Sequence, residues 1–290
     1  MRKTGWAAIA LILVAVSWGL TFVLMKPAIQ SQPFYDFLAT RFTLAVLVMI
    51  AVRPQVLRNI NRDLLIKGVP IGAMLGFGYV TQTIALELTT AAITGFLTGL
   101  YVVATPLLAW LFLRQKVTRK VLVGVVLATI GLALISVNFE NFGIEVGQIW
   151  GILCAIFFAA HIVGLGLFSP GLNTYALTVV QLATCAVISW IGALVDGYQA
   201  PETGDVWFAI IFSAVFATAI AFFVQTWAQS HMDASRVAII LTSEVVFAAA
   251  IAVAVGQEVL SLQVFIGGVI LVASMLVVEW PTQSLPPSTE

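Results

Sequence analysis

Glu244 is the residue best placed to do chemistry, because it lies in the middle of an apolar stretch of the chain. An acidic residue at the centre of a membrane-spanning helix costs roughly 2.5–3.5 kcal/mol, so it must be protonated, paired or facing water. In a wet cavity this carboxyl can bind a substrate ammonium group or carry a proton. A carboxyl held neutral by helix–helix hydrogen bonds is the structural alternative, and we favour function.

His161 is one of two histidines in the chain and also falls inside an apolar run. Imidazole titrates near physiological pH, so His161 could couple a transport step to protons. A histidine in a helix can equally be a hydrogen-bonded packing residue. We therefore predict possible proton coupling for Glu244 and His161, with protons as a possible partner.

Four aromatic residues lie too deep in their apolar runs to anchor a helix at the membrane surface: Trp18, Tyr79, Tyr101 and Phe222. An indole or a phenol hydroxyl in hydrocarbon needs a polar partner, which favours a polar cavity, although a backbone carbonyl could also serve. We predict a substrate-binding site formed by these four residues together with His161 and Glu244.

Arg41 and Pro106 are candidates for structural or gating roles. Arg41 lies two turns below the outer end of its apolar run, so its guanidinium is expected to snorkel to the outer headgroups and support the bundle rather than contact substrate. Pro106 leaves one backbone carbonyl free and permits a kink, which can be a gate hinge or a static bend.

The composition places these residues in a bilayer. Of 290 residues 61% are hydrophobic, mean hydropathy is +1.08, and 13 basic residues balance 13 acidic ones, whereas soluble domains are roughly 45–50% apolar. The zero net charge argues against nucleic acid as a partner. The sequence lacks a phosphate-binding glycine loop with lysine, so ATP is not expected, and we expect no cofactor, metal site or enzymatic activity. The partners expected are a small-molecule substrate and lipid.

Ten apolar runs are long enough to cross about 30 Å of hydrocarbon as helices. No run alternates in polarity as barrel strands do, so the predicted fold is an all-α polytopic membrane protein. A Pro/Ser-rich tail, 281–290, is predicted to be disordered. The predicted spans are 6–25, 34–52, 66–87, 91–113, 121–138, 147–168, 175–195, 207–230, 236–256 and 262–279.

An internal repeat relates the two halves at a shift of 143 residues, which brings the span boundaries into register. Each half then holds five helices, 1–140 and 141–280, and an odd number inverts the second copy. Inverted repeats are typical of transporters and place the substrate between the copies. The shift matches Trp18 with His161, Tyr79 with Phe222, and Tyr101 with Glu244, all near mid-membrane.

The distribution of basic residues predicts the orientation. With a cytoplasmic N-terminus, eleven Lys and Arg residues fall inside and Lys26 alone falls outside. The positive-inside rule therefore predicts that both termini of this multi-pass protein are cytoplasmic.

Several motifs resemble the EamA-like group of the drug/metabolite transporter superfamily: Ser17-Trp18-Gly19 with Phe22, Arg41-Phe42, and the run from Ala234 to Glu258 followed by Gly267-Gly268. Two positions depart from the family pattern, Val245 where many members have proline and Gln115 where glutamate is common. The chain is most similar to bacterial inner-membrane exporters of aromatic amino acids and related amphipathic compounds such as paraquat, and this resemblance implies location in a bacterial inner membrane. The resemblance implies a central cavity, with the fifth and tenth helices peripheral.

The predicted function is secondary export of amino acids, aromatic ones foremost, and of related metabolites or drugs by alternating access. One rival is a sugar-phosphate or nucleotide-sugar exchanger, which would need deep cationic residues, and Arg41 is the one basic residue that lies away from the ends of the predicted spans. Another alternative is a lipid-binding scaffold or an intramembrane enzyme. In the enzyme, Ser17 or Ser243 would pair with His161 as a nucleophile.

Overall fold

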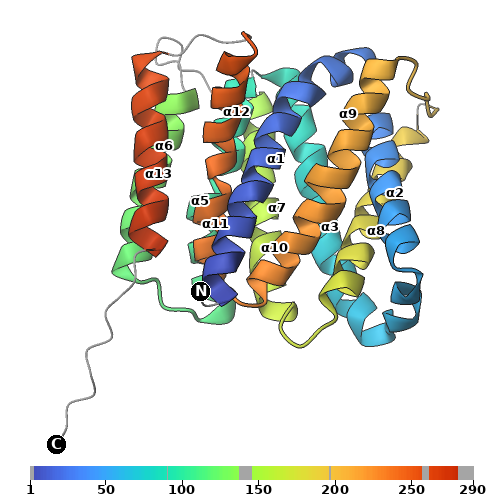
Figure 1. The fold of residues 1–290 in the computed structure, drawn as a ribbon, viewed down its shortest axis with the longest axis horizontal. Helices are drawn as coiled ribbons and strands as arrows, with labels where there is room; N and C mark the ends of the chain where they lie inside the picture. Colours follow the sequence, from blue (N-terminus) through green and yellow to red (C-terminus); the bar gives the residue numbers. More distant parts are fainter. Residues whose placement is uncertain (1–2, 90, 137–145, 196, 257–260, 280–290) are drawn as a thin grey trace, which may run out of the picture.

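A computed structural model of the chain describes residues 3–89, 91–136, 146–195, 197–256 and 261–279, and within these ranges all regular structure is helical (Figure 1). The predicted all-α membrane fold is confirmed. The predicted tail 281–290 and the boundary between the predicted halves at 140/141 lie outside the described residues. In chain order the elements are α1 (Lys3–Ser31), α2 (Phe34–Val52), the 3₁₀ turn η1 (Pro54–Asn59), α3 (Arg62–Leu88), α4 (Ala91–Gly99), α5 (Tyr101–Leu113), α6 (Arg119–Ser136), α7 (Val146–Phe168), α8 (Thr174–Ala193), α9 (Gly204–Ala214), the π-helical turn η2 (Val215–Ile220), α10 (Ala221–Gln229), α11 (Ala234–Leu241), α12 (Ser243–Ala254) and α13 (Leu262–Glu279).

Eight helical stretches of the described residues are long and apolar enough to cross a membrane. Three of them are composite, because α4 joins α5, α9 joins η2 and α10, and α11 joins α12. The remaining two helices, α6 and α13, correspond to the fifth and tenth predicted spans. Every predicted span is therefore matched by a helix or by consecutive helices.

The helices stand side by side in one bundle, with α6 and α13 together at one edge and α2 and α8 at the other (Figure 1). Glycines allow the backbones of α6 and α13 to touch. A Cβ added to Gly131 would lie 2.8 Å from the Gly267 carbonyl oxygen, and one added to Gly267 would lie 2.8 Å from the Gly131 carbonyl oxygen. Such close approach of small residues is a common way to join helices in lipid.

The predicted repeat shift of 143 residues pairs α1 with α7, α2 with α8 and α6 with α13, and the helix contacts can be compared on that pairing. Helix α1 packs on α12 and on α10, while its repeat counterpart α7 packs on α4 and α5 and on α3. Helices α6 and α13 are counterparts of each other, as are α2 and α8, and each of these pairs is in contact. A structure built from two related five-helix units would produce this exchange of partners.

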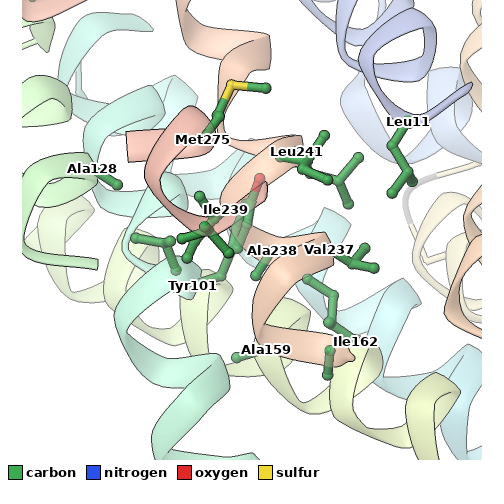
Figure 2. Close-up of a cluster of buried hydrophobic side chains, with 14 of the residues drawn as sticks. Leu11, Tyr101, Ala128, Ala159, Ile162, Val237, Ala238, Ile239, Leu241 and Met275 are labelled. Atoms are coloured by element: carbon green, nitrogen blue, oxygen red, sulfur yellow. The ribbon is translucent and has the colours of Figure 1, made fainter. Parts of the chain in front are cut away.

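Two clusters of buried apolar side chains form the core. The first involves α1, α5, α6, α7 and α10 to α13, and Figure 2 draws part of it, with Leu11, Tyr101, Ile162, Leu241 and Met275 contributed by five different helices. The second involves α1, α2, α3 and α8 to α10. Trp18 and Phe158 pack against both clusters. The boundary between the clusters therefore runs through the middle of the bundle.

Candidate functional site

One cavity lies where the two clusters meet, and all six predicted site residues line it. Its volume is about 70 Å³, several times the ~10–15 Å³ that a single water needs. The wall is completed by twelve further residues, several of them polar. The lining consists of Trp18, Tyr79, Tyr101, His161, Phe222 and Glu244 with Thr21, Phe22, Met25, Arg41, Leu75, Gln82, Thr83, Leu86, Phe158, Ile162, Gln225 and Leu241.

Glu244 lies in the first turn of α12, with its side chain 6% exposed. Tyr101 lines the same cavity, and its buried hydroxyl has no hydrogen-bond partner among the described residues. No oppositely charged group among the described residues lies within 4.0 Å of Glu244. Pairing with a cation, one of the three ways in which a carboxyl at this depth can be tolerated, is therefore not observed among the described residues.

Breaks in two composite spans position Tyr101 and Glu244. Leu100 separates α4 from α5, and Thr242 separates α11 from α12. At each break a tight i→i+3 hydrogen bond reaches the carbonyl of the break residue, at 2.9 Å for Leu100 and 3.2 Å for Thr242. The two interruptions lie 142 residues apart, within one residue of the predicted repeat shift. Discontinuous helices are typical of substrate sites in transporters.

Phe222 joins the aromatic residues of the cavity into one group. Its ring centroid lies 5.5 Å from that of Trp18, 6.2 Å from that of Tyr79 and 5.9 Å from that of His161. The Phe222 side chain is 2% exposed. Edge-to-face and tilted contacts at these separations are favourable for aromatic rings. These four residues were predicted to share one site, and in the structure their rings are in contact.

We expect Phe222→Ala to lower the free energy of unfolding by about 2 kcal/mol. In a soluble protein such a truncation costs ~3–5 kcal/mol, which combines the lost transfer of the ring from water with the cavity that it leaves. In a bilayer the ring would otherwise contact lipid, so mainly the cost of the cavity remains. The matched control is Phe216→Ala, since Phe216 belongs to the same composite span and is 50% exposed. Thermal unfolding of both variants in detergent measures the difference. Equal midpoints for the two variants would contradict a packing role for Phe222.

His161 was predicted to be either a cavity residue or a hydrogen-bonded packing residue, and in the structure it is both. Its Nε2 lies 2.8 Å from Oε1 of Gln181, and the amide nitrogen of Gln181 donates to the Thr226 hydroxyl at 3.3 Å. The side chain is 1% exposed. Proton coupling through His161 and Glu244 stays a prediction.

The π-helical turn η2 exposes a backbone carbonyl to the cavity wall. A π turn bonds five residues apart and so disturbs the regular i→i−4 pairing. The carbonyl of Ala217, within this turn, accepts the indole N–H of Trp18 at 2.8 Å. The partner that Trp18 needs in hydrocarbon is therefore this backbone group.

Arg41 does not snorkel, so that prediction was wrong. Its side chain is 1% exposed and lines the cavity, with Nε donating to the Thr218 hydroxyl at 2.7 Å and one terminal nitrogen 3.5 Å from the Tyr79 hydroxyl. The guanidinium carbon lies 5.1 Å from the centroid of the Tyr79 ring. The face of α2 that carries Arg41 packs on η2, and polar groups there bind the guanidinium within the bundle.

Pro106 lies inside α5, which is continuous from Tyr101 to Leu113. The interruption of this span is at Leu100, so the proline does not mark the break. The hydroxyl of Thr105, next to the proline, donates to the carbonyl of Tyr101 at 2.7 Å. A gating role for Pro106 stays a prediction.

Gln82, Thr83 and Gln225 line the cavity although they were not predicted as site residues. The sequence contains a sign of them, because Gln82-Thr83 and Gln225-Thr226 are identical pairs at the repeat distance. Buried amides are expected to be hydrogen-bonded, but Oε1 of Gln225 has no partner. A polar substrate or water in the cavity would satisfy it.

The serine–histidine pair required by the enzyme alternative is not formed. The Ser243 hydroxyl donates to the Ile240 carbonyl at 2.7 Å, and His161 is bonded to Gln181. The hydroxyl of Ser17 has no partner. Within the ranges described, no three His, Cys, Asp or Glu side chains are grouped as metal ligands.

Comparisons with known proteins agree with a membrane transporter. The profile of the EamA-like transporter family matches residues 5–137 and 145–280. An uncharacterized transporter of Archaeoglobus fulgidus is 31% identical over 277 residues, which cover 96% of this chain and 87% of the relative. One protein crystal structure superposes with a TM-score of 0.81 at 18% identity, over 95% of this chain and 96% of the other, and it supports the fold alone.

Proposed function

Since the chain belongs to the EamA-like transporter family, we propose that it exports amino acids, aromatic ones foremost, and related amphipathic metabolites or drugs. The proposed mechanism is alternating access, in which the central cavity opens to the two sides of the membrane in turn. The cavity lined by Trp18, Tyr79, Tyr101, His161, Phe222 and Glu244 is the proposed substrate site.

One observation carries this proposal: a cavity at mid-membrane combines aromatic faces with a deep carboxyl. Aromatic rings suit flat apolar substituents, and they also attract cations through their faces. A lipid-binding scaffold would have no use for charged side chains at the same depth. Sequestration of a polar, amphipathic solute accounts for both features.

The proposed setting is the inner membrane of a bacterium, with both termini in the cytoplasm. The clustering of basic residues in alternate connections supports this orientation. Proton exchange through Glu244 or His161 is the proposed energy source, because both titratable groups line the cavity.

The sugar-phosphate exchanger gains some support from Arg41, which turns into the cavity. Glu244 lines the same cavity and would repel a doubly charged phosphate. A phosphate site of this kind would need further cations, and Arg41 is the one arginine or lysine in the lining. The amino-acid substrate is therefore the better match.

Efflux from proteoliposomes tests the proposal. Vesicles containing the purified full chain and loaded with radiolabelled phenylalanine should release it faster than protein-free vesicles, and an opposing pH gradient should accelerate release further. Glucose 6-phosphate serves as the comparison solute. Release of the phosphate ester with no release of phenylalanine would overturn the proposal.

A further inference from the structure

Arg41 carries a buried charge, and no acidic side chain in the described part of the chain forms an ion pair with it. Its hydrogen-bond acceptors are all neutral: the Thr218 hydroxyl at 2.7 Å, the Met25 sulfur at 3.3 Å, and the Tyr79 hydroxyl and Ala217 carbonyl at 3.5 Å. Asp36, one turn away on α2, instead accepts the backbone N–H of Gln199 at 2.9 Å. An unpaired guanidinium at this depth is costly unless something else supplies the negative charge.

Glu244 presents the complementary situation on a separate wall of the same cavity. Arg41 belongs to α2 and is hydrogen-bonded to η2, whereas Glu244 belongs to α12 and lines the cavity with Tyr101 of α5. The two charged groups do not form an ion pair, since neither has an oppositely charged partner within 4.0 Å among the residues described. Both groups line one cavity together with Tyr79, so they surround the same space.

We propose that the cavity recognises a zwitterion by both of its charges, with the substrate carboxylate on Arg41 and the substrate ammonium on Glu244. The apolar part of the substrate lies against Trp18, Tyr79 and Phe222. The proposal deepens the proposed function and rests on it, because it defines the substrate class of the same site.

Physical reasons favour a zwitterion over a simple ion. A guanidinium binds a carboxylate through two parallel N–H···O bonds, and a carboxylate accepts from an ammonium group. With both contacts made, the charges of Arg41, Glu244 and the zwitterion sum to zero. The low dielectric of the cavity then strengthens the attraction within each of the two charge pairs. A phosphate dianion would meet Glu244, and an amine lacking a carboxylate would leave Arg41 unpaired.

The test compares three solutes of similar shape in proteoliposomes: L-phenylalanine, phenethylamine, which lacks the carboxylate, and 3-phenylpropanoate, which lacks the ammonium. We measure the concentration at which each unlabelled solute halves the uptake of labelled phenylalanine. For the wild type, phenylalanine should be effective at a concentration at least about tenfold lower than either analogue.

Two variants then assign the charges. Arg41→Gln should reduce the preference for phenylalanine over phenethylamine at least about tenfold, and Glu244→Gln should do the same for the preference over 3-phenylpropanoate. Uptake by these variants is followed by direct counting of each labelled solute. Arg58→Gln, an exposed arginine on η1, is the matched control and should keep both preferences.

The outcomes separate the inference from the proposed function. Loss of affinity for all three solutes by one common factor in Arg41→Gln would overturn the inference and make Arg41 a support for the bundle. If Arg41→Gln does not fold, equal competition by phenethylamine and phenylalanine in the wild type overturns the inference instead. Failure of the wild type to transport any of the three solutes would overturn the proposed function itself.

Discussion

Glu244→Gln should reduce the rate of phenylalanine efflux at least about tenfold while the folded protein remains in the membrane. Glutamine has nearly the shape of glutamate, so packing against Tyr101 is kept, but it carries no negative charge. Charged hydrogen bonds contribute about 1.5–3 kcal/mol, which corresponds to a factor of about 10 to 100. Efflux from proteoliposomes containing equal amounts of folded protein measures the effect.

Glu87→Gln is the matched control for this experiment, because Glu87 is an exposed glutamate near the end of α3. It should leave efflux within about twofold of the wild type. If Glu244 also carries the proton, acceleration by a pH gradient should vanish in Glu244→Gln and persist in Glu87→Gln. Unchanged efflux by Glu244→Gln would make this carboxyl a neutral packing group.

Gly19→Ala should cost at least about 1–3 kcal/mol of stability and abolish most transport, although it adds only one methyl group. A Cβ at Gly19 would lie 2.7 Å from the backbone nitrogen of Ala248 and 2.9 Å from the backbone carbonyl oxygen of Glu244. Backbone atoms of a neighbouring helix cannot turn aside as a flexible side chain can. The substitution would therefore push α12 away from α1 at the residue that presents the carboxyl.

Gly95→Ala provides the contrast, because a Cβ at Gly95 meets no atom within 4 Å. Alanine there should leave the thermal midpoint unchanged or raise it, since alanine is the better helix former by about 1 kcal/mol. Thermal unfolding and efflux of the two variants are measured in parallel. A Gly19→Ala protein with wild-type midpoint and efflux would show that the contact between α1 and α12 is less close than described.

The helical spans were largely predictable because the hydrocarbon core selects for them directly. The predicted 34–52 agrees with α2, while the predicted 6–25 is shorter than α1, Lys3–Ser31. Hydropathy reports the apolar part of a helix, and helices continue into the headgroup region where polar residues are allowed. Pro27 lies inside α1, so a proline near the end of an apolar run did not end the helix.

The lining of the cavity was predictable wherever the repeat matched polar or aromatic residues at mid-membrane. The conformation of Arg41 could not be predicted from the sequence. The depth of a residue in the membrane does not determine which face of its helix contacts a neighbouring helix. The π turn was also missed. Its sequence, Val215–Ile220, is an ordinary apolar run, and in the fold the turn packs against α1 and α2.

That turn has no counterpart in the first half, because the corresponding part of α3 belongs to a regular α-helix. Two structurally identical copies would give inward-facing and outward-facing forms of equal free energy. Under the proposed alternating access, Arg41 and Trp18 bind a turn that only the second half of the described chain contains, so we expect the two forms to differ in free energy and the empty protein to rest predominantly on one side of its cycle.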